Sequence, residues 1–261
     1  MKPGLVYGGF HVLTTAQIEQ IESWAKENGI TDVYFSVKPE DIPYMEYWMK
    51  QKPTLLLYKD SQKTPENTLE LSEDPDLREG NFEALPVRLR GILIERGLYR
   101  EECAHRLLKP KRYVHVESMT ELAVTLAKIH GADLNKTRIA GLFHDCTKAL
   151  PDEKNLTLMR LCAPEYLSRS KEVYHQYTGP FYLKFVLGYT DEEVLEAIRH
   201  HTDGDDEGLL SKILYLADKL DPSRGYDVTD MIDLAKKDLD AAVKKERELQ
   251  LEYLRKKGII A

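Results

Sequence analysis

The chain has 261 residues, enough for one large domain or two small ones. Its 44 acidic and 37 basic residues give a formal net charge of −7, which argues against general nucleic-acid binding because that function favours a basic face. No apolar run approaches the roughly 20 residues of a membrane-spanning helix, and the N-terminus lacks a secretory signal pattern. The three cysteines are irregularly spaced and suggest no disulfide framework. We therefore expect a cytoplasmic protein without nucleic-acid or membrane partners.

The first hundred residues alternate between strand and helix patterns. The segments that predict strands are 4–10, 31–37 and 53–60, and those that predict helices are 14–29, 43–51 and 84–99. In the first helix, Thr14 or Thr15 is the expected N-cap and Gly29 the residue beyond the C-cap. The polar, proline-containing segment 59–80 predicts a loop. This order predicts a small Rossmann-like α/β domain over residues 1–100.

From residue 101 to residue 261 the apolar periodicity is helical, and polar residues lie on the apolar faces. One face of segment 113–131 holds His115, Met119, Leu122, Leu126 and Ile129.

Two later helical segments repeat this feature. In segment 192–201 the stripe of Val194 and Ile198 continues to His201 and excludes its neighbour His200. In segment 209–220, Asp218 lies one turn beyond Leu214, on the edge of the apolar stripe. Buried histidine and aspartate are costly unless something satisfies them.

The segment 139–148 reads as an apolar helix that ends in the adjacent pair His144 and Asp145. Adjacent helical side chains lie about 100° apart, so the two cannot point to the same spot but can flank a dinuclear metal centre. Taken singly, each polar residue has an ordinary explanation as a hydrogen-bonded core histidine or a helix-capping aspartate. The set as a whole, with His175, predicts a metal site. Imidazole and carboxylate without thiolate suit Fe, Mn, Zn or Mg.

At these residues the chain resembles the HD-domain metal-dependent phosphohydrolases. More narrowly it resembles the YqeK-type family, whose members hydrolyse diadenosine tetraphosphate symmetrically to two ADP. The matching stretches are RYVHVESMTELAVTLAKIHGAD, IAGLFHDCTK, AIRHHTDG and ILYLADKLDPSRGYD. The resemblance implies an all-α HD domain over residues 101–261, within an α+β chain, and a centre of two divalent ions, iron in this family. The implied ligands are His115, His144, Asp145 and Asp218 for one ion, and Asp145, His175 and His201 for the other.

The resemblance also implies an enzyme that acts on a small-molecule nucleotide through a metal-bridging hydroxide. Asp145 and Lys148 are the expected catalytic residues, because Lys148 lies at i+3 from Asp145 and rises from the same face. The positions of Lys148, Thr202 and Arg224 match phosphate contacts of the family. The alternatives are an HD phosphohydrolase with another nucleotide or phosphate ester as substrate, and a non-catalytic nucleotide sensor. The oligomeric state stays open, a homodimer included.

One segment of the helical region departs from the family pattern. The acidic sequence DDEG at residues 205–208 departs from the family and would weaken polyphosphate binding unless it faces away or contacts metal.

In the first domain, VYGGF and LREGNFEALPVRLRGILIERGLY resemble a shortened nicotinate-nucleotide adenylyltransferase. The stretch GGFHVLTTAQ keeps His11 but lacks that family's second histidine and its glycine. We therefore expect a degenerate domain without adenylyltransferase activity, the alternative being a generic α/β domain.

Overall fold

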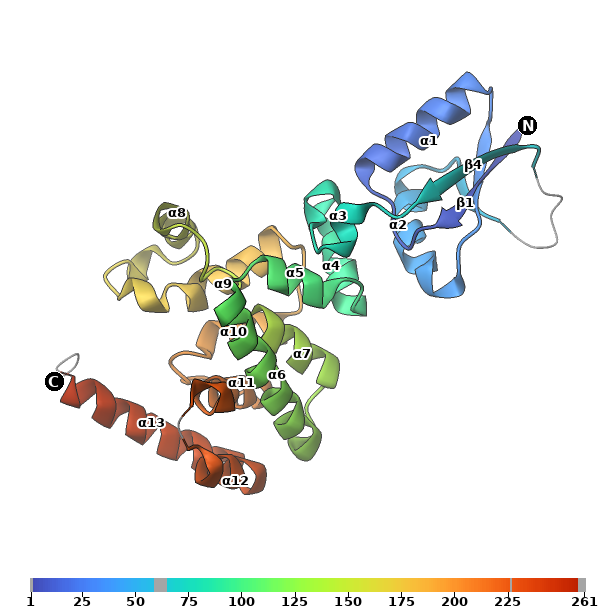
Figure 1. Ribbon diagram of the computed structural model, residues 1–261. Helices are drawn as coiled ribbons and strands as arrows, with labels where there is room; N and C mark the ends of the chain where they lie inside the picture. Colours follow the sequence, from blue (N-terminus) through green and yellow to red (C-terminus); the bar gives the residue numbers. More distant parts are fainter. Residues whose placement is uncertain (1, 59–64, 226, 258–261) are drawn as a thin grey trace. The chain divides into compact units, whose positions relative to one another are not determined.

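The computed structural model describes residues 2–58, 65–225 and 227–257, and the chain divides into two compact units (Figure 1). Unit 1 comprises Met1–Cys103 and unit 2 comprises Ala104–Ala261. All strands of the described residues belong to unit 1, whereas those of unit 2 form helices and their connections. The predicted α+β class, with a small α/β domain ahead of an all-helical domain, is confirmed.

Unit 1 is built on a four-stranded parallel sheet with the strand order β3-β2-β1-β4. Its strands are β1 (Pro3–Gly9), β2 (Asp32–Phe35), β3 (Leu55–Leu57) and β4 (Asn67–Ser72). Its helices are α1 (Thr15–Glu27), α2 (Ile42–Gln51), α3 (Pro75–Arg78) and α4 (Val87–Arg96), and α5 (Arg100–Arg106) leads into unit 2. The direction of the strand order reverses between β1 and β4, which in open α/β sheets is the usual position of a ligand site.

The predicted start and end of the first helix are confirmed, with Thr14 as the N-cap. The Thr14 hydroxyl accepts a hydrogen bond from the Gln17 backbone at 3.3 Å, and the Gln17 side chain accepts one from the Thr14 backbone at 2.9 Å. This reciprocal pair satisfies two backbone donors that a helix start leaves open. Gly29 follows the helix with a φ of +62°, a left-handed conformation that glycine adopts without a Cβ clash.

The prediction of a loop over residues 59–80 is wrong in part. Residues 59–64 lie outside the described residues, but β4 and α3 occupy much of the rest. The strand has a period of two, since Leu69 and Leu71 face inward between the exposed Thr68, Glu70 and Ser72. That alternation is short and lies in a very polar segment. Such a weak pattern suffices for an edge strand, and within the described residues β4 is one, with β1 as its single neighbour in the sheet.

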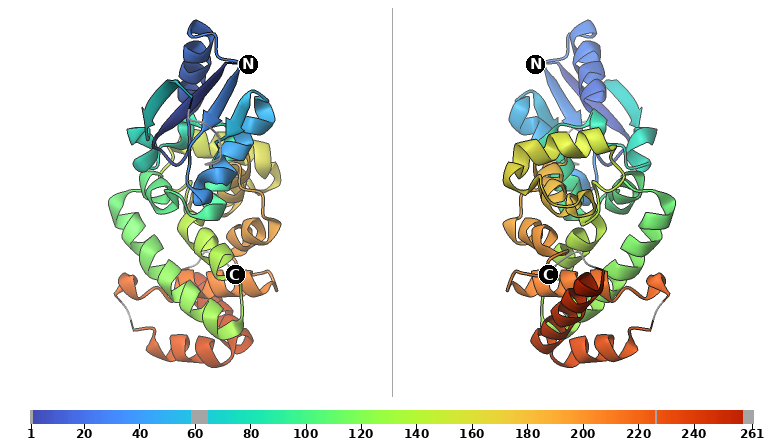
Figure 2. Two further views of the ribbon diagram at one scale, coloured as in Figure 1. Left: turned by 90° about the vertical axis from the view of Figure 1, so that its right-hand side faces the viewer. Right: turned by 90° about the vertical axis from the view of Figure 1, so that its left-hand side faces the viewer.

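Unit 2 is a helical assembly around α6, α7, α10 and α11. Its helices are α6 (Pro110–His130), α7 (Leu134–Phe143), α8 (Asp152–Cys162), α9 (His175–Phe185), α10 (Glu192–His200), α11 (Leu209–Lys219), α12 (Thr229–Lys237) and α13 (Leu239–Lys256). The long α6 packs against α7 and α11, while α10 packs against α7, α9 and α11. Figure 2 shows α6 in green and, near its C-terminal end, the red helices of the C-terminal part. At this end of α6, the His130 ring lies 2.7 Å from the Ala235 carbonyl oxygen of α12. The packed centre of unit 2 is therefore formed by α6, α7, α10 and α11.

One residue of the predicted core stripe of α6 is not in the core. His115, Met119 and Leu126 are buried, but Ile129 is 50% exposed. At 100° per residue, Ile129 lies about 40° from His115 and about 80° from Met119 around the helix axis. The stripe has therefore turned out of the core by the last turn of α6.

Candidate active site

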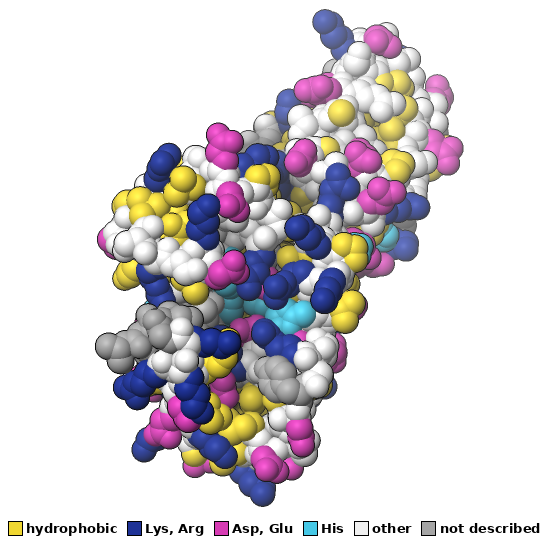
Figure 3. All heavy atoms as spheres, turned by 60° about the vertical axis from the view of Figure 1, so that its left-hand side comes forward, with side chains coloured by type: hydrophobic (Ala, Val, Ile, Leu, Met, Phe, Trp, Pro, Cys, Tyr) yellow, Lys and Arg dark blue, Asp and Glu magenta, His cyan; other side chains and the backbone are white. Residues whose placement is uncertain are grey.

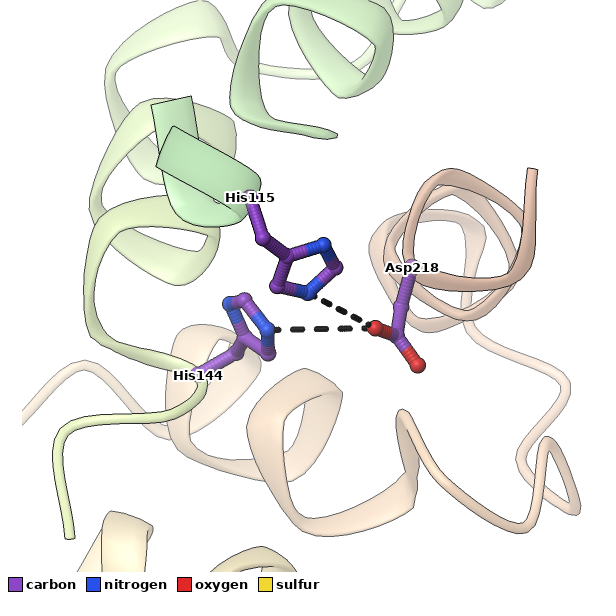
Figure 4. Close-up of side chains that lie close together, drawn as sticks. All are labelled: His115, His144 and Asp218. Carbon is purple, nitrogen blue, oxygen red and sulfur yellow. Dashed lines mark ion pairs between the residues drawn. The ribbon is translucent and has the colours of Figure 1, made fainter. Parts of the chain in front are cut away.

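His115, His144 and Asp218 converge in the middle of unit 2 (Figure 4). His115 comes from α6, His144 directly follows α7, and Asp218 lies in the last turn of α11. The Asp218 Oδ1 atom lies 3.2 Å from His115 Nε2 and 4.0 Å from His144 Nε2. Two consecutive helices and the distant α11 thus direct one ligand atom each to a common point.

A second set shares His144 with the first. His144, Asp145 and His201 each offer a ligand atom, and these atoms all lie within 4.8 Å of one another. His175 extends this set, because its Nε2 atom lies 3.3 Å from Asp145 Oδ1 and 3.1 Å from His201 Nε2. The structure thus gathers all six predicted ligand residues in one cluster, each at most 8% exposed. It groups His144 with His201 as well as with His115.

Hydrogen bonds fix the orientation of three of the four rings. His144 Nδ1 lies 2.7 Å from the Gly141 carbonyl oxygen, and His201 Nδ1 lies 2.6 Å from that of Ile198. A carbonyl oxygen can only accept, so both rings carry their proton on Nδ1 and present a bare Nε2 lone pair. His115 Nδ1 lies 2.6 Å from Asp221 Oδ2, which has the same effect. Rings held in this way are typical of metal ligands.

The cluster contains buried polar atoms whose hydrogen-bonding capacity is not used. Among the described residues, His115 Nε2, His144 Nε2 and both Asp145 carboxylate oxygens are buried without a hydrogen-bond partner. An unsatisfied buried acceptor costs about 1–3 kcal/mol, so four in one place require an explanation. All four are acceptors that face one another across a few ångströms, and divalent cations bind such imidazole and carboxylate sets. The residues present therefore fit a metal centre.

The protonation states of the cluster suit the same purpose. Burial lowers the pKa of His201 to about 4 and holds that of His175 well below its ordinary value, so both rings are neutral at pH 7. Burial alone would raise the pKa of Asp145, but electrostatic attraction to His144 and to the nearby Lys148 ammonium outweighs burial and holds that pKa well below the usual range. His175 and His201 are thus neutral imidazoles beside a charged carboxylate, the forms that bind metal.

Basic side chains line the edge of the cluster. Arg112 Nη1 lies 3.3 Å from Asp145 Oδ2, and Lys148 Nζ lies 3.6 Å from Asp145 Oδ1. Arg224 Nη2 lies 2.7 Å from Asp218 Oδ1. The Thr202 hydroxyl lies 3.3 Å from His201 Nε2. The three predicted phosphate-binding residues are therefore all in or next to the cluster.

A cavity of about 260 Å³ opens beside these residues. Lys109, Arg112, Lys148, Lys171 and His175 are among the residues that line it. Figure 3 shows histidine side chains at the floor of a hollow in unit 2 whose edge is rich in lysine and arginine. A basic hollow over a metal-binding cluster is suited to an anionic, phosphorylated ligand.

Two residues of the site did not follow from the sequence analysis. Asp221 is fully buried and orients His115, and Arg112 contacts Asp145. Each lies three residues from a predicted ligand, Arg112 before His115 on α6 and Asp221 after Asp218, but this spacing alone assigns no role to either. What the sequence does not show is that η5 (Pro222–Arg224) folds back against α6.

The acidic turn after α10 does not contact the ligands. Asp205 pairs with His200 at 2.6 Å, and Glu207 pairs with Lys212 at 2.9 Å. Asp206 accepts a hydrogen bond from the Gly208 backbone at 3.0 Å. These partners neutralise or occupy the three carboxylates. The acidic DDEG segment therefore does not cancel the positive charge of the lysine and arginine side chains beside the cluster.

Comparisons with known proteins agree with this geometry. Residues 112–223 match the family model of the HD domain. The symmetrical bis(5'-nucleosyl)-tetraphosphatase of Halalkalibacterium halodurans is 36% identical over 163 residues, which cover 59% of this chain and 87% of that protein. The crystal structure of a predicted HD superfamily hydrolase involved in NAD metabolism from Clostridium acetobutylicum is similar with a TM-score of 0.51 and 34% identity, covering 63% of this chain and 87% of that one.

The helical fold and the His/Asp cluster define an HD-domain hydrolase, the class of metal-dependent enzyme predicted from the sequence. Within that class, the chain belongs to the YqeK-type family that contains the symmetrical bis(5'-nucleosyl)-tetraphosphatases. In the described residues, no helix has both the length and the apolar composition needed to cross a membrane.

Unit 1 is also represented among the similar proteins. A probable nicotinate-nucleotide adenylyltransferase/Ap4A hydrolase of Mycoplasma genitalium is 26% identical over 243 residues, which cover 89% of this chain and 67% of that protein. That alignment is longer than unit 2, so it extends into unit 1. The predicted adenylyltransferase-like origin of the first domain agrees with this relative.

Proposed function

We propose that unit 2 hydrolyses diadenosine tetraphosphate symmetrically to two ADP with the help of two divalent metal ions, iron being the first candidate. The observation that carries this proposal is the buried set of nitrogen and oxygen acceptors that, among the described residues, have no hydrogen-bond partner and lie beside a basic cavity. The relatives named for this reaction are 33–36% identical, and this chain covers most of their length.

The proposed ligands of the first ion are His115, His144, Asp145 and Asp218. Those of the second ion are Asp145, His175 and His201, and Asp145 has both oxygens available for the two ions. Such ions supply Lewis-acid neutralisation of phosphoryl oxygens and a bound water acidic enough to act as a nucleophile near neutral pH.

The chain's own residues bind the polyphosphate and balance its charge. In the reaction, a water oxygen adds to one of the two central phosphorus atoms, the bridging P–O bond between the central phosphates breaks, and its oxygen leaves on the second ADP. Arg112 and Lys148, on either side of the Asp145 carboxylate, are placed to neutralise the charge on that leaving oxygen. Lys109 of the cavity is suited to a remaining phosphate, as is Lys171 once it leaves its 2.8 Å ion pair with Asp152. The Thr202 hydroxyl can donate to a phosphoryl oxygen at the cluster.

Product analysis tests the proposal. Purified protein reconstituted with Fe²⁺ or Mn²⁺ is incubated with diadenosine tetraphosphate, diadenosine triphosphate, ATP and AMP, and the products are separated by chromatography. We expect ADP as the only nucleotide from the tetraphosphate, and no turnover by Asp145→Asn. The variant Asp205→Asn, which alters an acidic group outside the cluster, should keep full activity. AMP together with ATP, or faster turnover of another nucleotide, would overturn the substrate assignment, and tight binding without turnover would favour a sensor.

We propose further that unit 1 does not transfer adenylyl groups. The loop after β1 lies where the strand order reverses, and its backbone N–H at His11 donates to Glu73 Oε2 at 2.7 Å. The His11 ring is itself bonded to the buried Asp41 carboxylate at 2.9 Å. A nucleotide phosphate at this loop would meet two carboxylates that already occupy its donors. Nicotinate mononucleotide and ATP should yield no pyrophosphate with the full chain, and measurable pyrophosphate would contradict this proposal.

A further inference from the structure

A single carboxylate connects the two segments that carry His175 and His201. Asp203 lies two residues after His201, in the turn that follows α10. Its Oδ2 atom accepts a hydrogen bond from Gln176 Nε2 at 2.9 Å, and Gln176 directly follows His175 at the start of α9. Gln176 is fully buried. Asp203 therefore links the backbone positions next to two of the proposed ligands of one ion.

Arg169 holds this carboxylate in place from a third segment. Its guanidinium makes two parallel contacts with Asp203, Nη1 to Oδ2 at 2.6 Å and Nη2 to Oδ1 at 2.9 Å. Arg169 Nη1 also donates to the hydroxyl of the buried Tyr177 on α9. A forked arginine–carboxylate pair fixes direction as well as distance. The start of α9, the turn after α10 and the segment before α9 are thus joined by one polar network.

His175 is the ligand candidate that depends most on such a link. The rings of His115, His144 and His201 each have an acceptor on Nδ1, as described above. In the part of the chain that the structure describes, His175 Nδ1 is buried without a hydrogen-bond partner. Apart from the contacts of its Nε2 atom with Asp145 and His201, the orientation of this ring depends on the position of the first turn of α9. The Gln176–Asp203 hydrogen bond anchors that turn.

We propose that Asp203, clamped by Arg169, is a positioning residue that sets the affinity of the second metal ion without contacting it. The inference rests on the proposed function, because it assumes that Asp145, His175 and His201 hold that ion. Without the Arg169–Asp203 pair, α9 and the turn after α10 can move apart by small amounts. Such movements first change the 3.1 Å distance between His175 Nε2 and His201 Nε2. The first ion uses His115 and Asp218, whose supports do not include Asp203.

The test is a Mn²⁺ titration of the full-length apoprotein by calorimetry, together with metal content by elemental analysis. The variants are Asp203→Asn and Arg169→Gln, with Asp205→Asn as the matched control in the same turn. Asp205 pairs with His200, which points away from the cluster, so this control should bind two ions like the wild type. We expect both test variants to bind the first ion normally and the second about 10–100-fold more weakly, as is typical when a residue supporting a ligand is changed. Circular dichroism should show an unchanged helix content.

Equal weakening of both ions would overturn the inference, because it would mean a general structural role. Two ions bound by Asp203→Asn with wild-type affinity would overturn it as well. Wild-type protein is titrated first, and a wild type that binds fewer than two ions would contradict the proposed function itself, independently of Asp203.

Discussion

Replacing Asp221 with asparagine tests whether a residue outside the ligand set controls metal affinity. Asp221 is fully buried, and its Oδ2 atom lies 2.6 Å from His115 Nδ1. Burial would raise the pKa of Asp221, but hydrogen bonds from two serines and from His115 lower it, so the residue is a carboxylate at neutral pH. This negative charge fixes the His115 proton on Nδ1 and makes Nε2 a better donor to metal.

The size of the effect follows from this geometry. Asparagine keeps the shape of the side chain and one acceptor, but it removes the charge and adds an N–H₂ group that cannot face His115 Nδ1–H. Outer-shell changes of this kind cost about 10–100-fold in metal affinity, which is about 1.4–2.8 kcal/mol of binding free energy. The helix content should not change, because the Ser223 hydroxyl donates to the same Oδ2 atom that faces His115 and can still donate to an amide oxygen there.

The assay is competition for Mn²⁺ between the protein and a chelator of known affinity. The control is Asp227→Asn, since Asp227 is an exposed residue of the same region that accepts hydrogen bonds from the Thr229 backbone and side chain. We expect the control to match the wild type and Asp221→Asn to release one ion at a tenfold or more lower chelator concentration. A wild-type titration curve for Asp221→Asn would refute the argument that His115 needs its carboxylate partner.

Three further predictions concern the cavity, the core and unit 1. Arg112→Gln should lower kcat for diadenosine tetraphosphate more than it raises the KM, because Arg112 is placed to neutralise charge on the leaving oxygen. A raised KM with an unchanged kcat in steady-state kinetics would contradict that role. Leu126→Ala should lower the free energy of unfolding by about 2–5 kcal/mol, because Leu126 is buried. Ile129→Ala should change that free energy by no more than about 0.5 kcal/mol. Chemical denaturation followed by circular dichroism measures both, and similar losses for the two variants would contradict the placement of Ile129 outside the core. Burial raises the pKa of Glu73, so its protonation stabilises folded unit 1 at low pH, and this contribution is lost as the pH rises through the raised value. The stability difference between wild type and Glu73→Gln should therefore change with pH when followed by fluorescence, since both tryptophans lie in unit 1, and a pH-independent difference would argue against a raised pKa.

Much of the candidate site could be predicted because its ligands sit on regular helices. Period-3.6 counting places His115 and His201 on buried faces and separates His201 from His200, and the structure shows the same difference in burial. The adjacent pair His144 and Asp145 needed no tertiary information either, since it lies at the end of an apolar segment.

The features that were missed depend on contacts between distant segments. Asp203 and Asp221 look like turn residues in the sequence, and their roles come from α9 and α6, which lie many residues away. The strand β4 was missed because four of its six residues are polar and its partner β1 lies about sixty residues earlier. Neither kind of pairing leaves a local periodicity, so residue patterns alone could not reveal it.

The central claim is that six buried histidine and aspartate side chains hold two metal ions. Anomalous diffraction from crystals of the protein loaded with Mn²⁺ tests it most directly, because it locates each ion relative to named side chains. We predict two peaks in unit 2, one among His115, His144 and Asp218 and the other among Asp145, His175 and His201. A single peak, or well-ordered crystals without a peak at these residues after loading, would contradict the two-metal centre.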